Sequence, residues 1–256
     1  MRLDLDTILA AADARTIDPP LARQLIAHVD LTSLSGDETP ARIVQLAEEA
    51  ERHGVAALCI LPAALPVARP ALTEGAVRLA TVANFPDGGD DLARAADEVA
   101  TAVAAGADEV DVVAPLKAAL EGDVGLVGEM VELCRAAAGP RTTLKLILET
   151  GRLERPELIT AVARSAVMAG VDFLKTSTGK SAVGATPEAA ALLLAVAEEA
   201  GGRVGVKVSG GVRTSRDALR YWHLAETILG ADWLRPAYFR LGASRLLADL
   251  VERAGP

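Results

Sequence analysis

The sequence predicts an α/β fold, a (β/α)8 (TIM) barrel, from the order of its apolar runs, its length and the absence of a competing motif. Eight short runs rich in Val, Ile and Leu alternate with Ala-rich amphipathic stretches, which is typical of a parallel sheet covered by helices. A chain of 256 residues suits one such barrel. No Rossmann G-x-G-x-x-G pattern follows the first run, so the barrel is favoured over a doubly wound open sheet.

The eight runs are the expected strands, and from the second onward they start roughly 20–35 residues apart, the length of one βα unit. They are Leu25–Leu31, Val55–Leu61, Val77–Ala83, Glu109–Ala114, Thr143–Leu148, Val171–Thr176, Val204–Val208 and Tyr238–Leu241.

Helical stretches lie between these runs, and one more precedes them. Asp90–Ala105, Pro187–Ala200 and Ser215–Leu229 have helical periodicity, and Asp4–Asp13 predicts an extra N-terminal helix. Thr186 and Thr214 are expected N-caps, the second in a capping box closed by Asp217. No linker interrupts the pattern, so residues 1–256 are expected to form one domain.

Composition limits the partners. The net charge of −9 argues against nucleic acid, whereas a locally cationic pocket in an acidic protein still accommodates a phosphorylated small molecule. No leader-like segment or apolar run of membrane length is seen, so we expect a cytoplasmic protein that binds no membrane. His28, His53 and His223 lack ligand spacing, and we expect neither a metal nor a cofactor.

The lysines are the first candidates for chemistry. The chain has 21 Arg but five Lys, and Lys145, Lys175 and Lys207 fall inside predicted strands. Arginine stays protonated in proteins, whereas a desolvated lysine is able to lose its proton. An amine nucleophile is therefore to be sought among these three residues.

Lys175 and Lys207 are expected on adjacent strands near the mouth of the barrel. If both point inward, their ammonium groups repel, and one of them becomes neutral and nucleophilic. Two alternatives stay open on this reasoning: Lys175 pairs with a carboxylate and remains charged, or one of the two lysines faces outward. The pattern does not decide between Lys175 and Lys207 as the nucleophile. Gly205, on the same face as Lys207, is expected to leave room for a long neighbour.

Asp111 shares a strand face with Glu109, while Val110 and Val112 face the helices. A carboxylate inside a barrel is costly unless it is paired, so we expect Asp111 to contact Lys207 or Lys175. The pair would then transfer protons, or it would be a structural ion pair.

Two glycine-containing loops predict a phosphate site. Gly210-Gly211 follows the seventh run and Gly242-Ala243-Ser244 follows the eighth, and these loops commonly hold phosphate in such barrels. Lys180, in the loop after Lys175, is a further expected phosphate ligand.

The chain resembles the deoxyribose-phosphate aldolase family over nearly its whole length. The most specific matches are Lys175-Thr176-Ser177-Thr178-Gly179 and Gly106-Ala107-Asp108-Glu109-Val110-Asp111-Val112-Val113. Shorter matches agree in order and spacing: Val29-Asp30-Leu31-Thr32, Leu58-Cys59-Ile60, Asn84-Phe85-Pro86, Glu149-Thr150-Gly151, Ser209-Gly210-Gly211-Val212-Arg213 and Gly242-Ala243-Ser244.

The resemblance implies reversible, metal-independent cleavage of 2-deoxy-D-ribose 5-phosphate to acetaldehyde and D-glyceraldehyde 3-phosphate, and a homo-oligomer (dimer or tetramer). By the same resemblance, Lys175 matches the Schiff-base lysine, and Asp111 and Lys207 match the proton-transfer pair. The remaining matches are phosphate-binding positions (Thr178, Gly179, Gly210, Gly211, Ser244) and pocket positions (Asp30, Thr32, Cys59).

Three departures from the family pattern bear on this assignment. Arg245 stands where related sequences often have a second serine, so the phosphate end is expected to be more cationic. Val208-Ser209 replaces a Pro-Ala pair, and no tyrosine follows Tyr238, so a C-terminal tyrosine is not expected to assist proton transfer. Two other functions fit the same residues: a lysine-dependent aldolase with a different aldehyde substrate, and a regulatory barrel that only binds a sugar phosphate.

Overall fold

The computed structural model describes residues 4–255. Within this range eight parallel strands pair in chain order and the last pairs with the first, which closes a barrel and confirms the predicted fold class. The strands are β1 (Val29–Ser33), β2 (Ala57–Ile60), β3 (Arg78–Ala83), β4 (Glu109–Val113), β5 (Thr143–Ile147), β6 (Phe173–Lys175), β7 (Gly205–Ser209) and β8 (Phe239–Ala243).

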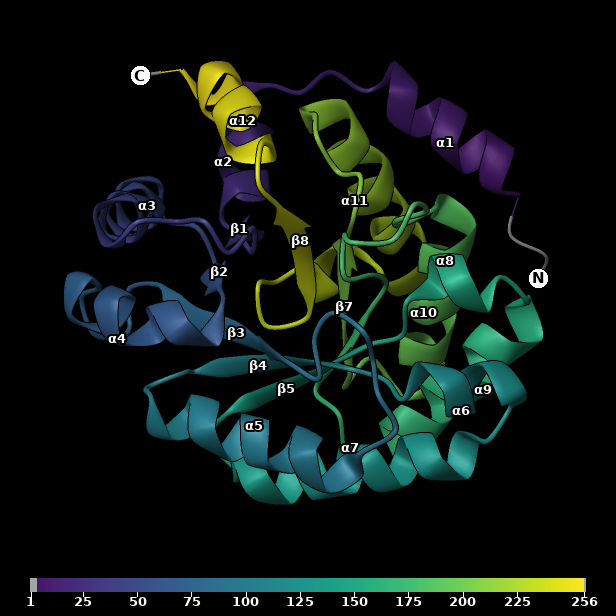
Figure 1. Ribbon diagram of the computed structural model, residues 1–256. Coiled ribbons are helices and arrows are strands. Elements are labelled where there is room, and N and C mark those ends of the chain that lie inside the picture. Colours follow the sequence, from purple (N-terminus) through teal and green to yellow (C-terminus); the bar gives the residue numbers. More distant parts are fainter. Residues whose placement is uncertain (1–3, 256) are drawn as a thin grey trace.

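Helices connect consecutive strands and surround the barrel (Figure 1). They are α3 (Pro40–His53), α4 (Leu65–Ala68), α5 (Leu92–Ala104), α6 (Leu116–Glu121), α7 (Val124–Ala138), α8 (Thr150–Leu153), α9 (Pro156–Met168), α10 (Pro187–Glu199), α11 (Ser215–Leu229) and α12 (Leu246–Ala254). Short 3₁₀ turns are η1 (Pro62–Ala64), η2 (Arg69–Ala71) and η3 (Ala231–Trp233).

The N-terminal region differs from the prediction. The extra helix is present as α1 (Leu5–Ala14), but a second helix, α2 (Pro19–Ile26), follows it. Asp18 caps α2 by accepting a hydrogen bond from the Leu21 backbone, and Pro19 occupies the first helical position. The expected strand Leu25–Leu31 is therefore wrong in its first half, because its opening apolar residues belong to α2.

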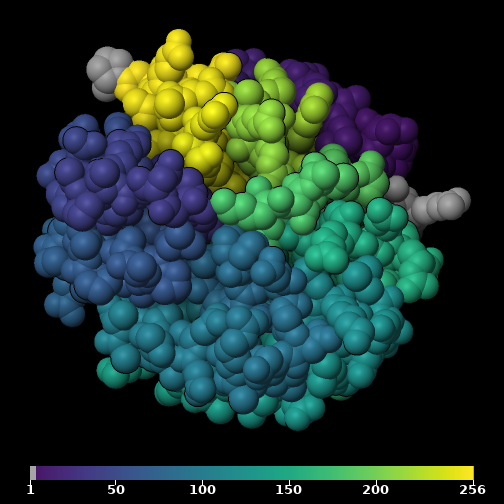
Figure 2. All heavy atoms as spheres, viewed as in Figure 1, coloured from purple at the N-terminus to yellow at the C-terminus, as the bar shows by residue number. Residues whose placement is uncertain are grey.

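Both N-terminal helices pack on the C-terminal part of the chain. α1 lies along α11 and α2 lies against α12 (Figure 1). Arg15 reaches Glu226 at 2.6 Å and Arg220 reaches Asp13 at 2.7 Å across the first of these contacts. In the space-filling view the last residues of the chain adjoin its N-terminal region (Figure 2), as barrel closure requires.

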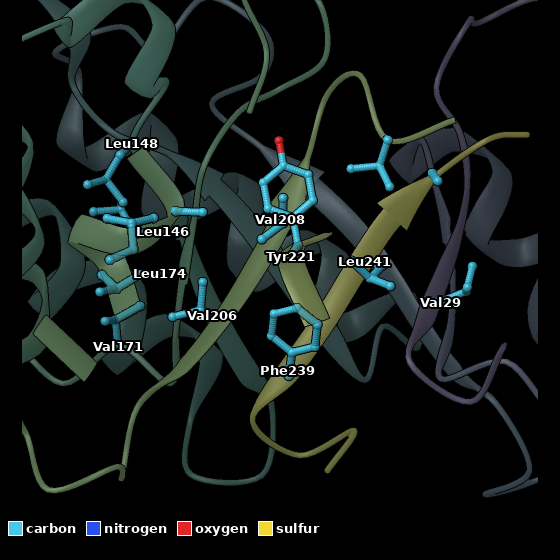
Figure 3. Packing of buried hydrophobic residues seen from close by; sticks show 14 of the residues in the cluster. Val29, Leu146, Leu148, Val171, Leu174, Val206, Val208, Tyr221, Phe239 and Leu241 are labelled. Carbon is cyan, nitrogen blue, oxygen red and sulfur yellow. The ribbon is translucent and has the colours of Figure 1, made fainter. Parts of the chain in front are cut away.

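Strand alternation separates an apolar outer face from a polar interior. Leu146, Leu174 and Val206 come from three neighbouring strands and pack side by side in the layer between barrel and helices (Figure 3). Their chain neighbours Lys145, Lys175 and Lys207 are buried on the opposite side. The barrel interior thus holds the ionisable groups.

Local sequence signals explain where several helices begin. Thr186 accepts from the backbone of Ala189, and Thr214 forms the predicted capping box with Asp217. In the acidic loop before α5, Asp91 is the N-cap. Across positions 4–255, none of the helices has both the length and the apolar character needed to cross a bilayer.

Candidate active site

A cavity of about 520 Å³ opens at the C-terminal ends of β1, β6, β7 and β8. This is the end of a barrel where reactive groups are normally found. Its wall is formed by Thr32, Ser33, Leu34, Ser35, Lys175, Thr178, Gly179, Lys180, Lys207, Ser209, Gly210, Gly211, Val212, Arg213, Gly242, Ala243, Ser244 and Arg245.

Lys175 and Lys207 are register partners on adjacent strands, and both point into the barrel. Their Nζ atoms lie 2.8 and 2.7 Å from the same oxygen, Oδ2 of Asp111. Lys145 contacts the other oxygen, Oδ1, at 2.7 Å. One buried carboxylate is thus shared among three lysines. The alternative in which one of the two mouth lysines faces outward is wrong.

Burial lowers the pKa of Lys175, and the neighbouring Lys207 ammonium lowers it further. The Asp111 carboxylate opposes both effects, but the pKa of Lys175 remains below its ordinary value. Because Asp111 serves three lysines, its single charge cannot neutralise all of them. Lys175 is therefore the lysine that most readily presents a free amine to the cavity.

Lys207 behaves in the opposite way. Burial alone would lower its pKa, but Asp111 and Asp30 outweigh burial and raise the pKa of Lys207 well above its usual value. Asp30 lies 2.5 Å from the Lys207 Nζ atom. Lys207 is thus held as an ammonium next to a lysine whose pKa is lowered.

Two glycines make room for these side chains. A Cβ atom on Gly242 would lie 3.0 Å from Cε of Lys207 and 2.9 Å from Cβ of Ser209. A Cβ on Gly205 would lie 2.4 Å from the ring of Phe173. The long neighbour predicted for Gly205 is therefore an aromatic ring from β6.

The predicted phosphate residues gather at one side of the cavity. Gly210 and Gly211 follow β7, and Ser244 and Arg245 lead from β8 into α12. Lys180 and Arg213 complete a group of exposed cations on the same wall with Arg245. The arrangement is a cationic rim beside backbone N–H groups that precede helices, which suits an anion.

The loop after β6 is fixed by a buried carboxylate. Glu149, which follows β5, accepts hydrogen bonds from the Thr178 hydroxyl and, at 3.3 Å, from the Thr178 backbone. The Thr178 hydroxyl oxygen in turn accepts from the Lys180 backbone at 3.0 Å. Glu149 therefore holds the segment that carries Thr178, Gly179 and Lys180 on the cavity wall.

The three pocket positions implied by the resemblance are in different places. Thr32 lies on the cavity wall, whereas Asp30 and Cys59 are fully buried and lie off it. Asp30 contacts Lys207, and Cys59 is close enough to affect the pKa of Lys175. These two residues therefore surround the lysines from within the barrel and do not form the cavity surface.

Sequence reasoning missed several residues at this site. Arg213 belongs to a matched segment and lies on the cavity wall, yet it was not among the expected ligands. Arg240, which was not singled out, is buried inside the barrel with Asp111, and the signal for it was the inward face of its strand. Lys145 and Glu109 were noted on their strands, but their contacts with Asp111 and Arg240 were not predicted. Considering only residues 4–255, we find no group of three or more His, Cys, Asp or Glu side chains that could hold a metal ion.

Solved structures with the same architecture include aldolases. Deoxyribose phosphate aldolase from Aeropyrum pernix, described as a tetramer, is 28% identical, with 96% of this chain and 95% of that chain covered and a TM-score of 0.74. A Coccidioides immitis protein provisionally assigned as a deoxyribose-phosphate aldolase is 28% identical, with 96% of both chains covered and a TM-score of 0.79.

A third similar structure, QR15, described as an aldolase, is 28% identical, with 91% of this chain and 96% of that chain covered and a TM-score of 0.76. The family model for DeoC/LacD family aldolases matches residues 24–250. That match spans every strand of the barrel and the cavity at its mouth. The chain therefore belongs to the DeoC/LacD aldolase family.

Proposed function

We propose that this protein reversibly cleaves 2-deoxy-D-ribose 5-phosphate to acetaldehyde and D-glyceraldehyde 3-phosphate, with Lys175 as the covalent nucleophile. The observation that carries the proposal is a buried Lys175 of lowered pKa at a cavity with a cationic rim. A cavity of about 520 Å³ falls within the range of small-molecule sites.

In the cleavage direction the neutral Lys175 amine attacks C1 of the open-chain sugar, and loss of water gives an iminium ion. A base removes the proton of the C3 hydroxyl, the C2–C3 bond breaks, and its electron pair moves into the iminium to form an enamine. D-glyceraldehyde 3-phosphate leaves. Protonation of the enamine at C2 and hydrolysis release acetaldehyde and regenerate the amine.

Asp111 and Lys207 are the proposed proton-transfer groups. The Oδ2 atom of Asp111 lies 2.8 Å from the Lys175 Nζ atom and 2.7 Å from the Lys207 Nζ atom. A proton that leaves the substrate therefore has a donor–acceptor chain beside the reacting nitrogen. Because the iminium nitrogen accepts the electron pair, the route needs no metal ion.

The 5-phosphate is proposed to bind at the rim formed by Gly210, Gly211, Ser244 and the three cations Lys180, Arg213 and Arg245. The side chain of Arg245 brings a positive charge to a position where a serine would only donate a hydrogen bond. This difference is expected to strengthen binding of the doubly charged phosphate.

The test is a cleavage assay that follows both products. Wild-type protein should release acetaldehyde and glyceraldehyde 3-phosphate in equal amounts, and Lys175→Ala should lose activity by about 10³-fold or more. Lys117→Ala, at an exposed site on α6, is the matched control. If the wild type does not cleave deoxyribose 5-phosphate but cleaves another aldol in a panel of donors and acceptors, the proposed substrate is wrong. If the wild type binds sugar phosphates and cleaves none of them, the proposed enzymatic function is wrong.

Assembly and location belong to the same proposal. A similar structure is described as a tetramer, and we infer a homo-oligomer, which light scattering after size exclusion measures directly. The acidic composition supports a small-molecule substrate over a nucleic-acid partner, and we infer a cytoplasmic location.

A further inference from the structure

Among the residues that the structure describes, seven acidic or basic side chains lie together in the interior of the barrel, and six of them form a closed ring. Within the described chain, Asp111 contacts Lys145 at 2.7 Å and Lys145 contacts Glu109 at 2.5 Å. Glu109 contacts Arg240 at 2.9 Å, and Arg240 contacts Asp30 at 2.7 Å. Asp30 contacts Lys207 at 2.5 Å, and Lys207 returns to Asp111 at 2.7 Å.

The ring alternates in sign and is neutral as a whole. Its three carboxylates belong to Asp30, Glu109 and Asp111, and its three cations belong to Lys145, Lys207 and Arg240. Each member is at most 5% exposed. Lys175 is attached to the ring through Asp111 alone, so a protonated Lys175 would add a buried charge that no further carboxylate in the described residues balances.

We propose that Arg240 and Glu109 are positioning residues of this enzyme: they complete the neutral ring that leaves Lys175 as the one surplus cation and therefore as the amine. The inference rests on the proposed function. Neither residue lines the substrate cavity. Both line a second cavity at the N-terminal ends of the strands, which is the opposite end of the barrel.

The pKa directions agree with this geometry. Asp111 and Glu109 raise the pKa of Lys145 against the effect of burial, and Asp30 and Glu109 do the same for Arg240. Among the four interior cations, Lys175 is the one whose pKa is lowered, and burial is the main cause. The groups that face Lys175 are Asp111, Lys207 and Cys59, with Lys145 on the shared carboxylate and Lys180, Arg213 and Arg245 across the cavity.

Removal of one ring charge should therefore move the pKa of Lys175 in a direction set by the sign of that charge. In Arg240→Gln, three carboxylates face two ring cations, so a proton on Lys175 restores neutrality and its pKa rises. In Glu109→Gln, the ring already carries an excess positive charge, so the pKa of Lys175 falls. The double variant is neutral again and should return close to the wild-type value.

The expected size of the shift in Arg240→Gln follows from the strand spacing. Lys175, Lys207 and Arg240 are register partners on three consecutive strands. Two strand spacings of about 4.8 Å place the backbones of Lys175 and Arg240 about 10 Å apart, and a unit charge at that distance shifts a pKa by about one unit at an effective dielectric constant of about 20.

The experiment is competitive labelling of Lys175 with acetic anhydride across a pH series, quantified by peptide mass spectrometry, with exposed Lys117 as the internal reference. The pH dependence of labelling gives the pKa of the Lys175 amine, and the measurement needs no sugar substrate. Opposite shifts in Arg240→Gln and Glu109→Gln, with recovery in the double variant, support the proposal. Shifts in the same direction, or none, overturn it even if the wild type cleaves deoxyribose 5-phosphate.

Two further readouts keep the test decisive. Arg240→Lys keeps the positive charge but loses the simultaneous guanidinium contacts with Asp30 and Glu109. The labelling pKa of Lys175 in this variant should therefore match the wild type, whereas a purely steric role of Arg240 predicts the same shift as in Arg240→Gln. If Arg240→Gln is not recovered as folded protein, the nearly isosteric Glu109→Gln decides alone: an unchanged labelling pKa contradicts the ring. Failure of the wild type to cleave the sugar phosphate would remove the proposed function and leave the labelling result intact.

Discussion

Lys175 and Lys207 reach the same carboxylate oxygen, Oδ2 of Asp111, at 2.8 and 2.7 Å. They differ in their carboxylate partners: Lys207 also contacts Asp30, whereas Asp111 is the one carboxylate that Lys175 contacts among the described residues. The second carboxylate keeps Lys207 protonated, and its charge in turn favours the neutral form of Lys175. The pKa values of two chemically identical side chains are thus shifted in opposite directions by their surroundings.

Lys207→Met should slow catalysis and move its pH dependence. Loss of the ammonium removes one cause of the lowered pKa of Lys175, so that pKa rises and the acidic limb of the kcat/KM profile moves to higher pH. Loss of a proton-transfer group should also reduce kcat by about 10²–10⁴-fold. Steady-state kinetics across pH 5–10 measure both effects, with Lys117→Met as the control. An unshifted limb would contradict the role of Lys207.

Asp30→Asn should destabilise the protein at neutral pH and much less in acid. Burial raises the pKa of Asp30, but Lys207 and Arg240 outweigh it and hold that pKa below the ordinary value of about 3.9. The carboxylate therefore contributes its full stability above about pH 5, and the contribution is lost as the pH falls below the ordinary pKa. Loss of one partner of a buried ionic network costs about 3–5 kcal/mol.

Urea unfolding at pH 7 and at pH 3 checks this expectation. The difference between wild type and Asp30→Asn should shrink at the lower pH. Asp13→Asn, in the half-exposed pair with Arg220, should leave both values close to wild type because water screens that pair. An equal loss at both pH values would show that the Asp30 charge is not what stabilises the fold.

Arg213→Ala and Arg245→Ser should weaken the binding of the phosphorylated substrate without affecting the chemistry. Each change is expected to raise KM for deoxyribose 5-phosphate by about tenfold, or about 1.4 kcal/mol, with kcat nearly unchanged. Activity on unphosphorylated deoxyribose should stay the same. Arg203→Ala, at the opposite end of the barrel, is the control. Equal losses on both sugars would place the phosphate elsewhere.

Two glycine substitutions should separate stability from catalysis. Gly205→Ala pushes a methyl group into the Phe173 ring and should lower stability by about 1–3 kcal/mol. Gly242→Ala pushes a methyl group against the Lys207 side chain and should reduce kcat by about 10-fold or more, because displaced catalytic groups lose alignment. Thermal melts and kcat measured on both variants test the contrast, which fails if Gly242→Ala keeps full kcat.

Strand periodicity predicted part of the centre of the site. The period of two placed Asp111 opposite Val110 and Val112, as the structure has them, but it left open whether both Lys175 and Lys207 face inward, which the structure shows. The choice of Lys175 over Lys207 came from the family resemblance, because it depends on which lysine has a second carboxylate. That carboxylate, Asp30, lies 177 positions before Lys207 in the chain.

The ring through Glu109 and Arg240 was beyond the reach of sequence patterns. The Glu109–Arg240 contact joins β4 with β8 across the barrel, and the Arg240–Asp30 contact joins the neighbouring strands β8 and β1. Both depend on strand tilt and stagger. The N-terminal error has a local cause: Leu25 and Ile26 belong to the buried face of α2, and their apolar run continues into β1 with only Ala27 and His28 between. Apolarity alone does not mark that boundary.

The central claim is that Lys175 forms the Schiff base, and borohydride trapping tests it most directly. Incubation with acetaldehyde and borohydride, followed by peptide mass spectrometry, should find an ethyl group on Lys175, and it should not find one at that site in Lys175→Ala. An ethyl group on Lys207 with Lys175 unmodified, in protein that cleaves deoxyribose 5-phosphate, would contradict the account.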